Sequence, residues 1–128
     1  MRILLLHNTY QNKGGEESVL ENEYQLLLDN NNTVEKLIFD NDTIKSSSDK
    51  LMVGIRSIYN NSSSRILKQK IIEFKPDIIH VHNFFPIASP SIFYVANKMK
   101  IPIVMTLHNY RLICPNALLL RNGKICEL

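Results

Sequence analysis

Pro76-Asp77-Ile78-Ile79-His80-Val81-His82 is the segment on which the predicted fold depends. A short apolar run bounded by polar residues indicates a buried β-strand over residues 77–82. Lys75 ends the helix before it, because a residue that precedes proline avoids the helical region. Similar runs predict three further strands, at residues 3–6, 34–39 and 101–107. Near-continuous apolar runs are typical of parallel strands that are covered on both faces.

Helical patterns separate these strands. Asn30-Asn31-Asn32 ends the first helix, residues 16–29, since asparagine tolerates the left-handed cap conformation. Periodicity predicts that its buried face comprises Val19, Leu20, Tyr24, Leu27 and Leu28. Asp49 is expected to cap a second helix, whose apolar face comprises Leu51, Met52, Ile55 and Ile58.

Two more helices are predicted before the third and fourth strands. Serines 62–64 are expected to cap one of them, whose inward residues are Ile66, Leu67, Ile71 and Phe74. Ser89-Pro90 starts the other, because a cap residue followed by proline is a strong helix start. Its inward residues are Ile92, Phe93, Val95, Ala96 and Met99.

The alternation of strands and helices predicts an α/β fold, namely a Rossmann-like three-layer domain with a parallel sheet. The end of the chain departs from this pattern. Asn122-Gly123 fits a type I′ turn between residues 117–120 and 124–126. We therefore expect a small C-terminal β-hairpin after the Rossmann-like part.

Composition supports one globular domain over residues 1–128. The chain is 45% apolar and is long enough to bury a core without disulfides or a metal. A net charge of +3, with no basic stripe interleaved with aromatic residues, argues against a nucleic-acid partner. No segment approaches the ~20 apolar residues of a membrane span, and the first apolar run is too short for a signal peptide. We expect a cytoplasmic protein in which Cys114 and Cys126 are thiols or metal ligands rather than a disulfide.

Ligands of parallel α/β sheets bind at the carboxyl ends of the strands. Gly14-Gly15 lies there, directly before a helix. Paired glycines allow close approach to the backbone, and a helix N-terminus attracts anions. The alternative is a flexible loop in which Glu16 and Glu17 only favour the helix dipole. The segment matches neither the dinucleotide fingerprint nor the P-loop.

Histidines end the third and fourth strands. His80 and His82 share one face of their strand, but no third ligand with plausible local spacing accompanies them. We therefore expect no metal at this pair and no other cofactor. His108 lies at the end of a buried parallel strand, where an imidazole can donate or accept near neutral pH. Contact with a substrate is favoured over the alternative, a histidine that caps the sheet through a backbone hydrogen bond.

Three segments together resemble the N-terminal domain of family 4 retaining glycosyltransferases, which have the GT-B fold. They are Gly14-Gly15-x-Glu17, Pro76-Asp77-Ile78-Ile79-His80-Val81-His82, and Ile101-Pro102-Ile103-Val104-Met105-Thr106-Leu107-His108. The resemblance covers essentially the whole chain. It implies an enzyme of two Rossmann-like domains that transfers a sugar from a nucleotide-sugar donor, with retention of configuration and usually without a metal. A cell-surface polysaccharide or lipid-linked precursor is the implied acceptor.

By this resemblance, residues 1–128 form the acceptor-side half of the enzyme. The C-terminal donor-binding domain is absent from the chain, so we expect the chain to be inactive alone. His108 would be the catalytic residue that contacts the donor sugar. Binding of donor or acceptor would involve Gly14, Gly15, Glu17, His82, Asn83 and Asn109. At Asn109 many relatives have an acid, and asparagine cannot act as a base.

The resemblance also concerns two segments outside this site. Residues 114–126 resemble a subgroup in which further cysteines follow, but two cysteines do not complete a structural zinc site, which needs four ligands. Residues 65–75 carry basic side chains around an apolar face. Relatives that act on lipid-linked acceptors dock such a helix to the membrane, which implies a peripheral contact with the inner membrane face. The alternative is an ordinary solvated helix face.

Two other classes of protein are alternatives. A stand-alone Rossmann-like binding or regulatory module would need no second domain. A receiver-type module, however, would place phosphorylatable acids at the end of the first strand, where His7-Asn8 lies. A nucleotide-cofactor domain is disfavoured by the missing glycine fingerprint.

Overall fold

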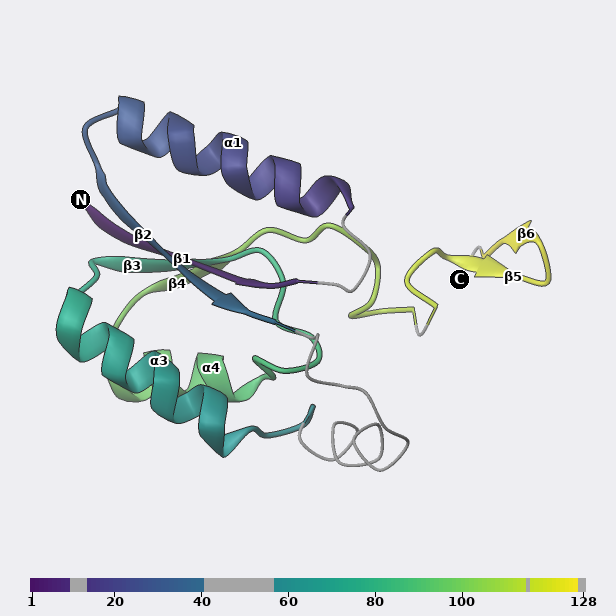
Figure 1. Cartoon of the computed structure of the whole chain (residues 1–128). Coiled ribbons are helices and arrows are strands. Elements are labelled where there is room, and N and C mark those ends of the chain that lie inside the picture. The colour runs from purple at the N-terminus through teal and green to yellow at the C-terminus, as the bar shows by residue number, and fades with distance from the viewer. Residues whose placement is uncertain (10–13, 41–56, 115, 127–128) are drawn as a thin grey trace.

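The computed structural model describes residues 1–9, 14–40, 57–114 and 116–126. Its main sheet has four parallel strands in the order β2-β1-β3-β4. The strands are β1 (Arg2–Asn8), β2 (Thr33–Phe39), β3 (Ile78–Val81) and β4 (Ile103–Met105). Helix α1 (Gly15–Asp29) covers one face, whereas α3 (Asn61–Phe74) and α4 (Ser91–Lys98) cover the other (Figure 1). The predicted three-layer, Rossmann-like α/β fold is confirmed.

Strand β1 forms the centre of the core, because it pairs with β2 on one side and with β3 on the other. Residues 3–8 are all buried. Successive side chains point to opposite faces of the sheet. Leu4 and Leu6 therefore join the core under α3 and α4, while Ile3 and Leu5 pack with Leu20 of α1. The apolar run is buried on both faces, as its sequence predicts.

The order of the strands creates a switch point between β1 and β3. The chain leaves β1 through α1 to reach β2 on one side, and it later enters β3 on the other side. In open parallel sheets, such a reversal forms a crevice at the carboxyl ends of the two strands. Those ends carry His7 and Asn8 from β1, and His82 and Asn83 directly after β3.

Helix α3 begins earlier than predicted, because Asn60 caps it in place of the serines. Its Oδ1 accepts hydrogen bonds from the backbone N–H groups of Ser62 and Ser63, at 3.0 and 3.3 Å. Its Nδ2 also donates to the carbonyl oxygen of Ile87 at 2.8 Å. The predicted end of the helix is confirmed, since Lys75 adopts the left-handed conformation with φ 49°.

Three apolar side chains that were predicted to be buried are exposed. The exposed side chains are Val19, Leu28 and Ile66. They lie at the borders of the apolar stripes whose centres, Leu20 and Leu67, are buried. A helix on a sheet buries one stripe of its surface, so the predicted stripes were too wide. The helix predicted after Asp49 lies mostly outside the described residues.

The strands at the carboxyl side are shorter than predicted. Strand β4 has three residues, although the N–H of Thr106 continues the pairing by donating to the carbonyl oxygen of Val81 at 2.9 Å. Pro102 has no N–H with which to extend the strand backwards, and only its carbonyl oxygen is used, by the N–H of Ile79.

None of the described helices is long and apolar enough to cross a membrane.

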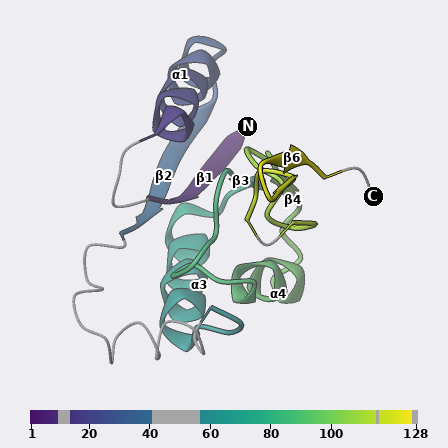
Figure 2. The same cartoon turned by 90° about the vertical axis from the view of Figure 1, so that its right-hand side faces the viewer.

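The predicted C-terminal hairpin is confirmed and consists of β5 (Leu120–Arg121) and β6 (Lys124–Ile125). Asn122 and Gly123 have φ values of 52° and 75°, as a type I′ turn requires at both positions. The first arm is shorter than predicted, because Leu119 also has a positive φ and leaves the extended conformation. The hairpin lies beyond the carboxyl ends of the sheet (Figures 1 and 2).

Asn60→Ala should lower the free energy of unfolding by about 2 kcal/mol, the upper range for loss of a helix cap. The reason is that the substitution removes two hydrogen bonds to the helix N-terminus and leaves the carbonyl of Ile87 without this donor. Urea unfolding followed by circular dichroism measures the effect. The exposed neighbour Asn61 provides the control, since Asn61→Ala should change stability by less than about 0.5 kcal/mol. Equal effects of the two substitutions would contradict the assigned cap.

Candidate functional site

His80 of strand β3, His82 directly after it and His108 of the segment after β4 form one cluster on the face of the sheet that α1 covers. The rings of His80 and His82 lie 4.5 Å apart, and those of His82 and His108 are stacked at 5.3 Å. Nδ1 of His82 is 3.1 Å from Nε2 of His108. The parallel pairing of His80 with Val104 explains this, because every second residue after Val104 returns to the same face.

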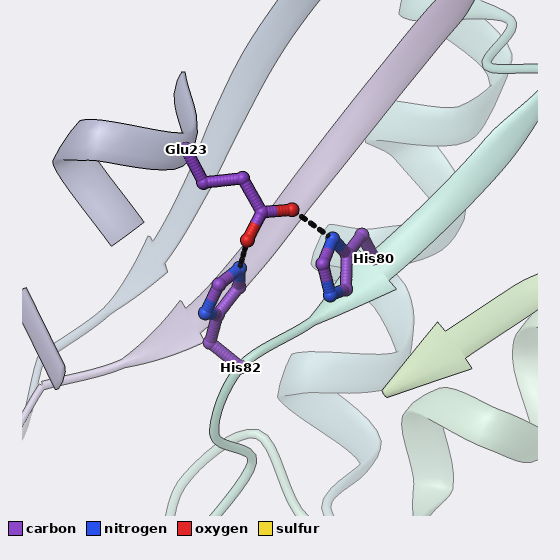
Figure 3. A group of neighbouring side chains, drawn as sticks. All are labelled: Glu23, His80 and His82. Atoms are coloured by element: carbon purple, nitrogen blue, oxygen red, sulfur yellow. Dashed lines mark ion pairs between the residues drawn. The ribbon is translucent and has the colours of Figure 1, made fainter. Parts of the chain in front are cut away.

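Helix α1 adds a carboxylate to this cluster. Glu23 reaches from α1 toward the imidazoles of His80 and His82 (Figure 3). Its Oε1 lies 2.6 Å from Nδ1 of His80, and its Oε2 lies 3.3 Å from Nε2 of His82. On the far side of its ring, Nε2 of His80 contacts the hydroxyl of Thr106 at 2.8 Å. Glu23 therefore links helix α1 to strand β3 through polar contacts.

Burial controls the charge of His82. Burial, together with the neighbouring His80, His108 and His7, lowers the pKa of His82 from 6.5 to about 4. The nearby carboxylate of Glu23 favours the protonated ring of His82. Loss of solvation on burial disfavours that charged ring, and this is the larger effect on the pKa. His82 is therefore neutral at pH 7, and its contact with His108 is a hydrogen bond in which one of the two rings donates. Which ring donates depends on the tautomers.

The first turn of α1 forms a second polar group beside the same crevice. The N–H of Gly14 donates to Oε2 of Glu17 at 2.7 Å. Oε1 of Glu17 lies 4.0 Å from Nε2 of His7, whose pKa is lowered by burial. The carboxylate of Glu17 thus already accepts the hydrogen bond that the Gly14 N–H could otherwise donate to an anion. Neither Gly14 nor Gly15 has a positive φ, so their backbone conformation does not require glycine.

The predicted site residues Asn83 and Asn109 are engaged by neighbouring groups. Nδ2 of Asn83 donates to the carbonyl oxygen of Asn8 at 2.8 Å, and its Oδ1 accepts from the N–H of Phe85 at 3.2 Å. Asn83 is buried and so holds the loop after β3 against β1. Nδ2 of Asn109 donates to Oε1 of Glu16 at 3.4 Å. Asn109 therefore ties the segment after β4 to the first turn of α1.

An open cavity adjoins this cluster. It has a volume of about 270 Å³ and is lined by Leu107, His108, Asn109, Tyr110, Leu112 and Ile113. A smaller hollow, which shares several lining residues with this cavity, includes His82, Asn83 and His108. Of the residues predicted for the site, His108 and Asn109 line both spaces. The cluster thus combines polar groups with an apolar wall, as small-molecule sites usually do.

The sequence of residues 6–123 matches the pattern of Glycosyltransferase Family 4. The chain belongs to that family. Membership places it among the glycosyltransferases, and the resemblance drawn from its three motifs is confirmed.

One sequence relative and one solved structure extend the comparison for this family 4 chain. It is 32% identical over 74 residues to an "uncharacterized 42.6 kDa protein in cps region" of Klebsiella pneumoniae, which covers 58% of the chain and 20% of that protein. Its fold is similar to that of UDP-GlcNAc 2-epimerase from Neisseria meningitidis, with a TM-score of 0.53 and 16% identity. That match covers 91% of the chain and 36% of the epimerase. The epimerase likeness shows the fold alone, and the matches span a minor part of both proteins.

The structure adds one observation to the sequence analysis of this family 4 chain. His80 and His82 have a third potential metal ligand beside them, Glu23, which comes from α1. Local spacing could not reveal it, because α1 and β3 are separated in the sequence by β2 and α3. Asn8 was also missed as a site residue, although its Oδ1 accepts from the N–H groups of Ile87 and Ala88. Cys114 and Cys126 are both free thiols.

The stability of the protein should fall as the pH is lowered from about 7 to about 5. The folded-state pKa of His82 lies below its ordinary value, so the unfolded chain binds more protons in this range. The contribution of His82 is at most about 1.4 kcal/mol for each pH unit. Urea unfolding across this range measures the slope. His82→Gln should flatten it relative to the parent protein, and an unchanged slope would show that other groups cause the pH dependence.

Proposed function

We propose that this chain is the acceptor-side, N-terminal domain of a two-domain glycosyltransferase. The enzyme would transfer a sugar from a nucleotide-sugar donor to a cell-surface polysaccharide or a lipid-linked acceptor, with retention of configuration. A second Rossmann-like domain would bind most of the donor. Membership of family 4 supports the proposal, as does the crevice at the carboxyl ends of β1 and β3, where ligands of such sheets bind.

The observation that carries the proposal is the position of His108. It lines both the 270 Å³ cavity and the hollow beside Asn83. Its Nε2 contacts His82, and within the described residues no protein group bonds to its Nδ1. When the neutral His82 donates from Nδ1, His108 carries its own proton on Nδ1. That N–H would then donate a hydrogen bond to a sugar or phosphate oxygen in the crevice.

The neighbouring residues support this role by holding His108 in place. Asn109, the next residue, is tied to Glu16 of α1, and His82 is buried under the ring. A catalytic group whose orientation is held before the substrate arrives loses less entropy on binding. Asn109 is an amide and cannot act as a base, so its proposed role is to hold the neighbouring His108 in position.

His108→Ala should reduce turnover by about a hundredfold in the protein that contains the second domain, the typical cost of removing one preorganised donor. Its melting temperature should change little, because the ring is only partly buried. Val104→Ala is the control, since Val104 is an exposed residue of β4 and its loss should leave both quantities unchanged. Release of the nucleotide from a panel of nucleotide sugars measures turnover. A parallel loss of activity and stability would make His108 a structural residue.

The need for a second domain is tested separately by the reading frame after the codon for Leu128. Continuation into another α/β domain is expected. A stop codon at that point would contradict the proposal, and it would favour the stand-alone binding or regulatory module.

We also propose a peripheral membrane contact through helix α3. Arg65 and Lys68 are exposed, and the apolar side chains Ile66 and Ile72 are exposed beside them, at 44% and 57%. Basic side chains attract anionic lipids while exposed apolar ones enter the interface. Lys70 is less available, because it pairs with Glu35 of β2.

Arg65→Gln/Lys68→Gln should weaken sedimentation of the protein with anionic vesicles at low salt, because each basic residue near the surface contributes about 1 kcal/mol. Lys98→Gln/Lys100→Gln is the matched control, since it removes the same charge from exposed positions at the end of α4. It should sediment like the parent protein. Binding that is absent, or that does not respond to salt, would contradict the membrane contact.

A further inference from the structure

Glu23, His80 and His82 converge on one point between helix α1 and strand β3. One ligand atom from each residue can be chosen so that all lie within 4.8 Å of one another. Figure 3 shows the carboxylate facing both imidazoles. Two imidazoles and one carboxylate are a recurrent ligand set for transition metals, whereas Mg²⁺ and Ca²⁺ prefer oxygen ligands.

The environment of His82 gives independent support for a ligand at this point. Its Nε2 is buried and has no hydrogen-bond partner among the described residues, although Oε2 of Glu23 lies 3.3 Å away. A buried polar atom without a partner costs free energy. A metal ion bound by the lone pair of this nitrogen would remove that cost.

The opposite nitrogens of both rings are held by neighbours. Nε2 of His80 contacts the hydroxyl oxygen of Thr106 at 2.8 Å, and Nδ1 of His82 contacts Nε2 of His108 at 3.1 Å. Metal-binding histidines almost always have such a partner on the nitrogen that does not bind the metal, because it sets the tautomer and the ring orientation. His80 and His82 therefore already have the surroundings of metal ligands.

We propose that Glu23, His80 and His82 bind a divalent transition-metal ion of the zinc type. The ion would be held by Nδ1 of His80, Nε2 of His82 and the carboxylate of Glu23. Ligands of tetrahedral zinc lie about 3.3 Å apart, so Glu23 must retreat from His80 by less than about 1 Å. Glu23 is 25% exposed and His80 16% exposed, which leaves a path for the ion and a fourth position for water.

Such an ion would have two consequences for the molecule. It would clamp α1 to β3, replacing the polar contacts that Glu23 makes now. It would also decide the tautomer of His82, since metal on Nε2 leaves the proton on Nδ1. His82 then donates to Nε2 of His108, and the proton of His108 lies on Nδ1. The metal would thus hold His108 as a hydrogen-bond donor without touching it.

Titration of the purified protein with Zn²⁺ alone, in a Cys114→Ser/Cys126→Ser background, tests the site. This background removes the two thiols, which could bind zinc by themselves. Calorimetry should show one equivalent of Zn²⁺, and Co²⁺ in its place should give the visible absorption of four-coordinate cobalt. Zn²⁺ should also raise the melting temperature, since it binds only the folded chain.

Glu23→Gln and His80→Gln should each weaken Zn²⁺ binding by at least about tenfold, which loss of a supporting partner alone can cause. Glu21→Gln is the matched control, because Glu21 lies on the same helix but pairs with Lys36. It should bind Zn²⁺ like the parent. Far-UV circular dichroism confirms that each variant is folded. The absence of stoichiometric binding in the folded parent, or equal affinity of Glu23→Gln and Glu21→Gln, would overturn the proposal whatever the enzymatic activity.

Discussion

Burial of residues 3–8 of strand β1 is the constraint on which the rest of the structure depends. Residues 3–8 have no exposed side chain, and their backbone groups pair with β2 on one side and β3 on the other. A buried backbone must find such partners. Side chains on both faces of β1 are buried, so helices must cover both faces of the sheet. The end of β1 consequently lies inside the protein. His7 and Asn8 consequently become buried polar groups at the crevice.

These buried polar groups organise the carboxyl edge of the sheet. Asn8 accepts hydrogen bonds from the N–H groups of Ile87 and Ala88, and Asn83 donates back to the carbonyl oxygen of Asn8. The loop after β3 is held against β1 by this exchange. The chain can then leave the loop in the position from which α4 and β4 follow. The result is that His108 of the segment after β4 stacks on His82.

The polar residues on the α1 face have a different physical character from this network. Asn8 and Asn83 are neutral, and their side chains form hydrogen bonds to the neighbouring backbone. The imidazoles and the carboxylates of Glu16, Glu17 and Glu23 can change charge, and burial disfavours the charged form of His7 and His82. The carboxyl edge of the sheet thus combines a neutral hydrogen-bonded scaffold with titratable groups. In general, the chemistry of a protein depends on the groups that its fold carries rather than on the fold itself.

The sequence by itself determined the strands through their apolar runs and the parallel sheet through the alternation of strands and helices. It also determined that His80 and His82 share one face, because side chains alternate with a two-residue period along a strand. It also determined the hairpin turn at Asn122-Gly123, which depends on local backbone preferences. Only the tertiary structure decided that Glu23 meets these histidines and that Asn60 caps α3 against the carbonyl of Ile87. Those contacts join elements distant in the sequence, and they form only when the helices pack on the sheet. Periodicity describes one element at a time and carries no information about which element faces another.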